Sequence, residues 1–387
     1  MLSEKSIKNN HIYEVDKNKN YFNIKKKERN YGIDLLRIFS MINIINLHIN
    51  LFSRQLVLEF SSPKFKAIWR LEVFSYPAVN CFGLISGIVG YTKYKFSNLI
   101  YLWLTVFFYS ISISSYLFYT KNGINQKSLF LSLFPILIKR HWYVNAYFYM
   151  YVLLPFINCG ISSLNSSFHK NTIIFFILFY TIYYMIAKIV DLNSDFNFLN
   201  GGYSSMWLVI LYIIGAYFGK YIIINEKNKN YLVYLLMFLF STFLTSELYF
   251  SLIKSKVKNN KKMLINYLSP TMLIQAISLV MIYSKLNIRN KLLMKIISFL
   301  VPLNFSAQLI HARLFQTKIK IIKFFFNCIL QLKPKLLFFK IYGFGILIYF
   351  ICICIDYIRL LIFKLLKIRD FSLFIEKSIP RLINRIF

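Results

Sequence analysis

Long apolar segments alternate with short polar, lysine-rich segments along almost the whole chain. The apolar segments are about 20 residues long, which is the length an α-helix needs to cross the hydrocarbon core of a bilayer. Because a membrane offers no water to unpaired backbone groups, such segments fold as helices. The pattern predicts ten membrane-spanning helices, at residues 33–52, 73–91, 98–119, 142–161, 172–190, 206–224, 231–253, 264–284, 296–315 and 341–363.

Two further apolar stretches do not fit this length. Residues 128–138 are too few to span a bilayer and are expected at the interface or in a re-entrant loop. Residues 320–332 alternate Lys with Ile and Phe, which is typical of an amphipathic helix lying on the membrane surface. Three prolines fall within predicted spans and are expected to kink them, namely Pro155, Pro270 and Pro302.

The first predicted span contains three ionisable residues, Asp34, Arg37 and His48. An ionisable group in hydrocarbon costs at least a few kcal/mol and usually faces a cavity or a partner. At about 100° per residue, Arg37 and His48 differ by a net rotation of about 20°, and Asp34 lies about 60° to the other side, so all three share one face. The helical rise separates Arg37 from His48 by about 16 Å, which suits the two ends of one long ligand.

Two other patterns predict how the helices pack. Three asparagines lie on the opposite side of the first span and are suited to hydrogen bonds with neighbouring helices, namely Asn43, Asn46 and Asn50. The second span carries a face of small residues, which lets two helices approach closely: Gly83, Ser86, Gly87 and Gly90.

Other polar residues inside the predicted spans have to be weighed against structural roles. His311 adds a second intramembrane imidazole, which favours a site shared with the first span, although a packed, hydrogen-bonded histidine is the commoner case. Glu247 is either a structural polar contact or part of the same cavity. Asp356 and Arg359 are interpreted as an i, i+3 ion pair near the membrane interface.

The composition agrees with a membrane protein. A chain with 57% hydrophobic residues, 19% aromatic residues and a mean hydropathy of +0.53 is not a soluble globular domain. The net charge of +33 comes mainly from Lys and Arg in the tails and between apolar segments, so it indicates membrane-flanking loops and no nucleic-acid partner. The five cysteines show neither metal-ligand spacing nor a disulfide framework, and no metal site is expected.

The charge distribution also predicts an orientation. Residues 1–30 carry eight Lys and Arg and residues 364–387 carry six, which places both termini in the cytoplasm and agrees with an even number of spans. The predicted external loop 191–205 carries no Lys or Arg, whereas the external loop 254–262 carries five, which opposes the assignment. Residues 1–30 are expected to be a disordered cytosolic tail and residues 366–387 a basic cytosolic tail.

Five short motifs occur in order along residues 31–365: Ile33 to Arg37 with His48, Gly83 to Gly87, His141 to Tyr147 continuing to Leu154-Pro155-Phe156-Ile157-Asn158, Leu211 to Tyr217, and Phe305 to His311. They resemble the Arg-x10-His, Ser-Gly, Trp-Phe-x-x-Ala-Tyr…Ser-Pro-Phe, Tyr-x-x-Gly-Ala-Tyr and Phe-Gly-x-Tyr-Leu-Ile-His motifs of the membrane acyltransferase family 3. Bacterial enzymes that O-acetylate glycans typify this family. The chain has Ser306 and Gln308 where the family often has Gly and Tyr, and Lys93 and Lys95 near positions that are usually Arg.

The resemblance implies an all-α, polytopic O-acyltransferase with about ten transmembrane helices around an intramembrane polar cavity. It implies transfer of an acyl group, commonly acetyl, from cytosolic acyl-CoA as co-substrate to a hydroxyl of a glycan or lipid-linked glycan, with no bound cofactor. The expected localisation is the plasma membrane.

The residues suit such a reaction. An arginine fork near the cytosolic face suits a phosphate-bearing donor, so Arg37 is expected to position acyl-CoA. Imidazole has an ordinary pKa near neutrality, so His48 is expected to act as the general base. Asp34 either orients Arg37 as part of the site or forms a plain ion pair with it on the helix surface. Four further residues are expected in the donor site or cavity, namely His311, Trp142, Ser86 and Glu247.

Two alternatives remain open. A transporter or exporter of a sugar-linked or lipid substrate would also line its path with buried ionisable residues. A relative that binds a glycan or lipid without catalysis would retain the cavity but not the chemistry. Acyl transfer by the purified protein distinguishes the enzyme from both.

Overall fold

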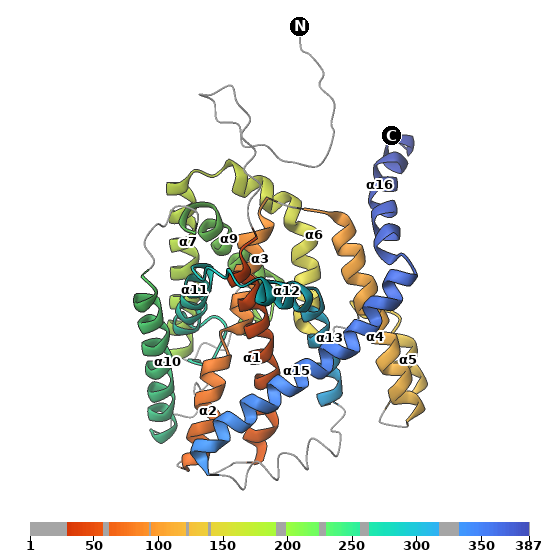
Figure 1. Ribbon diagram of the computed structural model, residues 1–387. Helices are drawn as coiled ribbons and strands as arrows, with labels where there is room; N and C mark the ends of the chain where they lie inside the picture. The colour runs from red at the N-terminus through yellow and green to blue at the C-terminus, as the bar shows by residue number, and fades with distance from the viewer. Residues whose placement is uncertain are drawn as a thin grey trace. The chain divides into compact units, whose positions relative to one another are not determined.

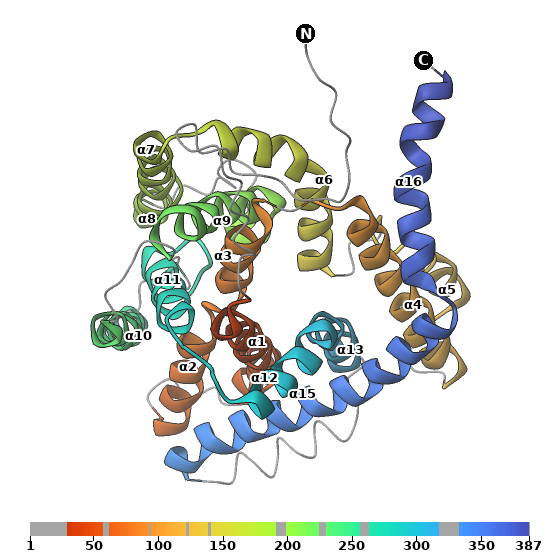
Figure 2. The same cartoon turned by 45° about the horizontal axis from the view of Figure 1, so that its top comes forward.

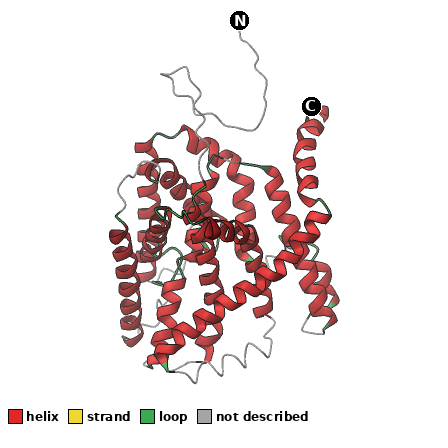
Figure 3. Cartoon of the chain, viewed as in Figure 1, coloured by secondary structure: helices red, strands yellow, loops and turns green. Residues whose placement is uncertain are grey.

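A computed structural model describes residues 29–56, 62–92, 94–120, 124–137, 141–190, 199–223, 230–255, 263–316 and 333–386. Within these ranges the chain is helical and contains no strand (Figure 3). Residues 31–387 form one compact unit, separate from residues 1–30, and the fold described here is that of the larger unit. The predicted surface helix at 320–332 and almost all of the predicted N-terminal tail lie outside the described residues.

The helices follow one another along the chain as shown in Figure 1: α1 (Tyr31–Leu56), α2 (Pro63–Ser75), α3 (Ala78–Gly90), α4 (Phe96–Tyr119), α5 (Gln126–Leu131), α6 (Trp142–Ser163), α7 (Ser166–Ile177), α8 (Tyr183–Ile189), α9 (Ser205–Tyr217), α10 (Tyr231–Lys254), α11 (Pro270–Ser284), α12 (Lys291–Leu300), α13 (Asn304–Gln316), α15 (Pro334–Leu365) and α16 (Ile368–Ile386). Single π-helical turns follow α7 (Leu178–Ile182) and α9 (Phe218–Ile222), and 3₁₀ turns precede α9 (Asn200–Gly202) and α13 (Val301–Leu303).

Within the described residues, nine helical stretches are long and apolar enough to cross a bilayer. They confirm nine of the ten predicted spans, some with shifted bounds. The predicted span at 264–284 differs, because α11 begins only at Pro270 and contains 15 residues. Proline is well suited to a first helical turn, where its missing N–H costs no hydrogen bond, so the predicted kink at Pro270 is wrong.

The second span is longer than predicted. It runs from Pro63 to Gly90 as two helices, α2 and α3, with a break at Pro77. Hydropathy alone overlooks α2 because Arg70 and Glu72 interrupt its apolar residues. The predicted break at Pro302 is confirmed, since a 3₁₀ turn there separates α12 from α13.

The shorter predicted segments also take helical form in part. The described part of the 128–138 stretch, residues 128–137, contains only the end of the six-residue helix α5 and turns, which confirms that it does not span the membrane. The predicted basic tail at 366–387 contains the amphipathic helix α16.

Helix α1 lies at the centre of the described bundle. It packs against α2, α3, α11, α12, α13 and α15, as Figure 2 shows. Its asparagine face contacts α2 and α15, as predicted: Asn43 accepts a hydrogen bond from Ser75 at 3.0 Å and donates to the Tyr342 hydroxyl of α15 at 3.5 Å, and the Asn50 amide donates to the Ile68 carbonyl at 3.4 Å. The face of α1 that carries His48 meets α13.

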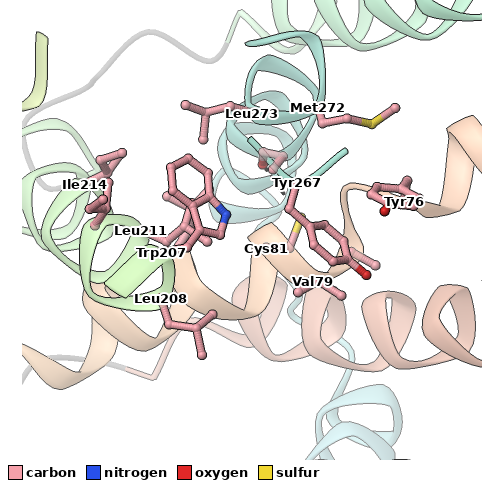
Figure 4. Close-up of a cluster of buried hydrophobic side chains, with 14 of the residues drawn as sticks. Tyr76, Val79, Cys81, Trp207, Leu208, Leu211, Ile214, Tyr267, Met272 and Leu273 are labelled. Atoms are coloured by element: carbon pink, nitrogen blue, oxygen red, sulfur yellow. Dashed lines mark hydrogen bonds between the residues drawn. The ribbon is translucent and has the colours of Figure 1, made fainter. Parts of the chain in front are cut away.

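Helices α3 and α9 pack backbone to backbone. A Cβ atom added at Gly87 would lie 2.0 Å from the Tyr212 carbonyl oxygen, and one added at Gly215 would lie 2.0 Å from the Leu84 carbonyl oxygen. Both distances are far below van der Waals contact, so only glycine permits this approach. The predicted small-residue face of the second span is confirmed. The apolar core continues from this contact through Trp207 and Leu211 (Figure 4).

Candidate active site

The structure brings together the two predicted intramembrane histidines. Nδ1 of His48 on α1 lies 2.8 Å from Nε2 of His311 on α13, although 263 residues separate them in the chain. The other ring nitrogen of His311, Nδ1, is hydrogen bonded to the backbone carbonyl of Ala307, one helical turn earlier. His311 is buried, whereas His48 is half-buried, so His48 is the more accessible member of the pair.

These contacts determine which nitrogen of each neutral ring carries the proton. A carbonyl oxygen only accepts hydrogen bonds, so Nδ1 of His311 is the protonated nitrogen and its Nε2 is an acceptor. His48 must then donate from Nδ1 to Nε2 of His311. The remaining nitrogen of His48, Nε2, therefore carries a lone pair. A half-buried imidazole with that tautomer is equipped to accept a proton from a substrate.

Arg37 and Asp34 form an ion pair nearer the start of α1. Nη1 of Arg37 donates to Asp34, whose side chain is buried, while the side chain of Arg37 is partly exposed. The Asn304 amide donates to the Arg37 carbonyl oxygen at 3.0 Å, which ties the start of α13 to α1. A guanidinium has five N–H donors, so the bond to Asp34 orients Arg37 and leaves donors for a ligand.

Helix α6 runs past both the histidine pair and the ion pair of Arg37 with Asp34. The phenol of Tyr147 lies beside the Ser86 hydroxyl and within electrostatic range of Arg37. His141, six residues earlier, lines a small cavity together with Leu309 of α13, two residues before His311. The six residues correspond to about 9 Å along a helix, so α6 passes from the histidine pair to the arginine. We call Arg37, Ser86 and Tyr147 the arginine end of the site, and His48 with His311 the histidine end.

The family comparison agrees with this geometry. The family model for an acyltransferase domain, acyltransferase 3, matches residues 30–358, which is most of the chain. The chain belongs to the acyltransferase 3 family. The motif-based assignment is thereby confirmed. Together with its nine long apolar helices within the described residues, the family identifies the chain as an integral membrane acyltransferase. Searches of curated proteins and of solved structures found no significant match.

Two other predicted site residues of the acyltransferase 3 protein lie outside this pairing. Trp142 begins α6 directly after His141, and its ring contacts Tyr203 and Tyr267. Glu247 on α10 forms an ion pair with Arg70 on α2 at 3.0 Å, with 44% and 56% of the two side chains exposed. Of the two interpretations of Glu247, this geometry fits the structural contact between helices.

One ion pair is more deeply buried, and has more hydrogen-bond partners, than the sequence predicts. Asp356 and Arg359 form the predicted i, i+3 pair, but the side chains are 0% and 3% exposed, so the pair is enclosed by protein. Tyr109 donates to Asp356 at 2.7 Å, and Arg359 donates to Tyr101 at 3.0 Å. Both tyrosines belong to α4, so the network joins α4 to α15. The sequence contains no signal that links these helices.

Proposed function

We propose that this acyltransferase 3 protein transfers an acyl group, in the first instance acetyl, from cytosolic acyl-CoA to a hydroxyl group of a cell-envelope glycan. The observation that supports the chemistry most directly is the hydrogen-bonded pair of His48 and His311, which leaves Nε2 of His48 unprotonated. The plasma membrane is the proposed location, with both termini in the cytoplasm.

In the proposed reaction His48 acts as the general base. As the acceptor oxygen attacks the thioester carbonyl, its proton moves to Nε2 of His48, a C–O bond forms and the C–S bond breaks. The proton then passes to the departing CoA thiolate, so the enzyme returns to its starting state. General-base catalysis of this kind contributes roughly 10²- to 10⁴-fold to the rate. His311 is a positioning residue, because its bond to Nδ1 of His48 keeps the required tautomer.

The arginine end is the proposed donor site. The guanidinium of Arg37 is suited to a phosphate group of CoA, since a planar fork makes two parallel, charge-assisted hydrogen bonds to phosphate. Asp34 holds the fork in place, and the hydroxyls of Ser86 and Tyr147 supply further polar contacts beside it. A donor with its phosphates at Arg37 would extend toward His48 over about 16 Å of helix axis.

The experiment is acyl transfer by the full-length protein in lipid nanodiscs. Labelled acetyl-CoA is supplied with oligosaccharides released from the cell envelope of the source organism, and the acetylated product is measured by mass spectrometry. His48→Gln keeps a polar side chain of similar size and is expected to lower transfer by at least 10²-fold. His169→Gln is the matched control, because His169 on α7 is a buried histidine whose Nε2 is hydrogen bonded to the Ile213 carbonyl of α9 and which belongs to no part of the proposed site.

Unchanged transfer in His48→Gln would refute the assignment of the base. Uptake of oligosaccharide by proteoliposomes that hold the protein, without acyl chemistry, would support the transporter alternative, and binding without either would support a non-catalytic relative. In cells, deletion of the gene is expected to lower the acetyl content of the envelope. Of the two variant genes, His169→Gln is expected to restore it and His48→Gln is not. Cysteine labelling at each terminus tests the proposed orientation.

A further inference from the structure

Four aromatic rings from separate parts of the chain form a cluster outside the histidine pair. Trp142 begins α6, Tyr76 lies between α2 and α3, Tyr203 precedes α9, and Tyr267 lies before α11. The ring centroids of Trp142 and Tyr203 are 4.6 Å apart, those of Tyr203 and Tyr267 are 4.9 Å apart, and those of Tyr76 and Tyr267 are 4.5 Å apart. We call these four residues the aromatic cluster.

The aromatic cluster is buried on one side and open on the other. Tyr76 and Tyr267 are buried, whereas Trp142 is half-buried and Tyr203 is 38% exposed. The hydroxyl group of the exposed Tyr203 lies 3.3 Å from that of the buried Tyr76, so the cluster has polar atoms beside its ring faces. Such a surface, apolar in its body and polar at its edge, matches a ligand that has both an apolar face and polar groups.

The backbone beneath the cluster is held rigidly. The buried side chain of Asn80 accepts a hydrogen bond from Nε1 of Trp207 and donates to the Tyr267 carbonyl, both at 3.0 Å. Figure 4 shows Tyr76 and Tyr267 side by side, with Trp207 nearby. Gly202 has φ of +86°, and a Cβ atom there would lie 2.5 Å from Cβ of Tyr267. A surface fixed in this way binds a ligand without the entropy cost of ordering loops.

The cluster lies on the acceptor side of the proposed site. Trp142 directly follows His141, which lines a small cavity together with Leu309 of α13, two residues before His311, whereas Tyr147 of the arginine end lies five residues further along α6. Successive spans cross in opposite directions, and α9 belongs to the sixth candidate span. Tyr203, which precedes α9, therefore lies toward the face opposite to the start of α1.

We propose that the aromatic cluster binds a sugar ring of the acceptor, an inference that rests on the proposed transfer to a glycan. A pyranose has apolar C–H faces and hydroxyl groups around its edge. The rings of Trp142 and Tyr203 cover a C–H face, and the hydroxyls of Tyr76 and Tyr203 bond to the sugar hydroxyls. The proposal places the bound ring next to Trp142, one residue after His141.

The test compares Tyr203→Ala with Tyr183→Ala in the full-length protein in nanodiscs. Tyr183 on α8 is 40% exposed and belongs to no part of the site, which makes it a matched control. Tyr203→Ala is expected to raise the KM for envelope-derived oligosaccharides by at least about tenfold, as the loss of a central aromatic contact does. The KM for acetyl-CoA and the thermal unfolding midpoint are expected to remain unchanged, and Tyr203→Phe is expected to lie between the wild type and Tyr203→Ala.

Binding is measured separately, so that this proposal and the proposed reaction can fail independently. Oligosaccharide binding to His48→Gln protein is followed by saturation-transfer NMR, which needs no turnover. Retained binding in His48→Gln, lost on adding Tyr203→Ala, supports the cluster as the sugar site even if no acyl transfer is found. An unchanged KM and unchanged binding in Tyr203→Ala would overturn the proposal, as would a wild-type protein that binds no oligosaccharide.

Discussion

The contact between His48 and His311 leads to a quantitative prediction about His311. Replacing His311 with Phe keeps the aromatic volume but removes the acceptor for Nδ1–H of His48. A donor deprived of its partner in a buried site loses about 1–3 kcal/mol, and 1.36 kcal/mol corresponds to a factor of ten in rate. If this loss falls on the positioning of His48, kcat decreases by about 5- to 150-fold. The largest decrease expected for His311→Phe is therefore about equal to the smallest decrease expected for His48→Gln, which removes the base itself.

Two further variants identify the mechanism of the loss. His311→Gln retains an acceptor oxygen and is expected to recover part of the activity. In the double variant with His48→Gln, His311→Phe is expected to cause no further loss, because a positioning residue acts through the base. The assay is single-turnover acetyl transfer in nanodiscs, with thermal unfolding measured in parallel for each variant.

The double variant distinguishes a positioning role of His311 from a direct role on the substrate. Losses that add, so that the double variant is slower than His48→Gln by the full effect of His311→Phe, would show that His311 acts on the substrate and not through His48. An unchanged kcat in His311→Phe would show that the hydrogen bond between the two rings has no part in catalysis. Either result would refute the tautomer argument.

Three other changes follow from the contacts described above. Gly215→Ala is expected to lower the thermal unfolding midpoint in detergent, because overpacking of a tight contact costs about 1–3 kcal/mol, whereas Gly160→Ala is expected to be tolerated since nothing lies within 4 Å of the added Cβ. Arg37→Lys is expected to raise the KM for acetyl-CoA with little change in the KM for the acceptor, because charge is kept and the bidentate fork is lost. Arg359→Gln leaves a buried carboxylate unpaired and is expected to destabilise the fold by about 3–5 kcal/mol, while Arg70→Gln, which breaks an exposed pair, is expected to cost at most about 1 kcal/mol. An equal effect of the last two variants would contradict the role of burial.

The sequence by itself determined the membrane character, most of the spans and the polar face of α1. The bilayer imposes the length of an apolar helix, and the helical repeat places Arg37 and His48 on one face, so both follow from local spacing. The glycine face of the second span could also be predicted from the sequence, since close helix approach requires small residues. The ordered motifs were sufficient to identify the family.

Only the tertiary structure decided which distant residues meet. No local pattern states that His311 lies against His48, that Asp356 and Arg359 are enclosed by tyrosines of α4, or that Glu247 belongs to an exposed pair. Helix α2 was overlooked because its charges lower its hydropathy, although burial against α1 and pairing with α10 accommodate them. Partners of this kind are selected by packing between helices far apart in the chain, whereas spacing along one helix specifies only the face that each residue occupies.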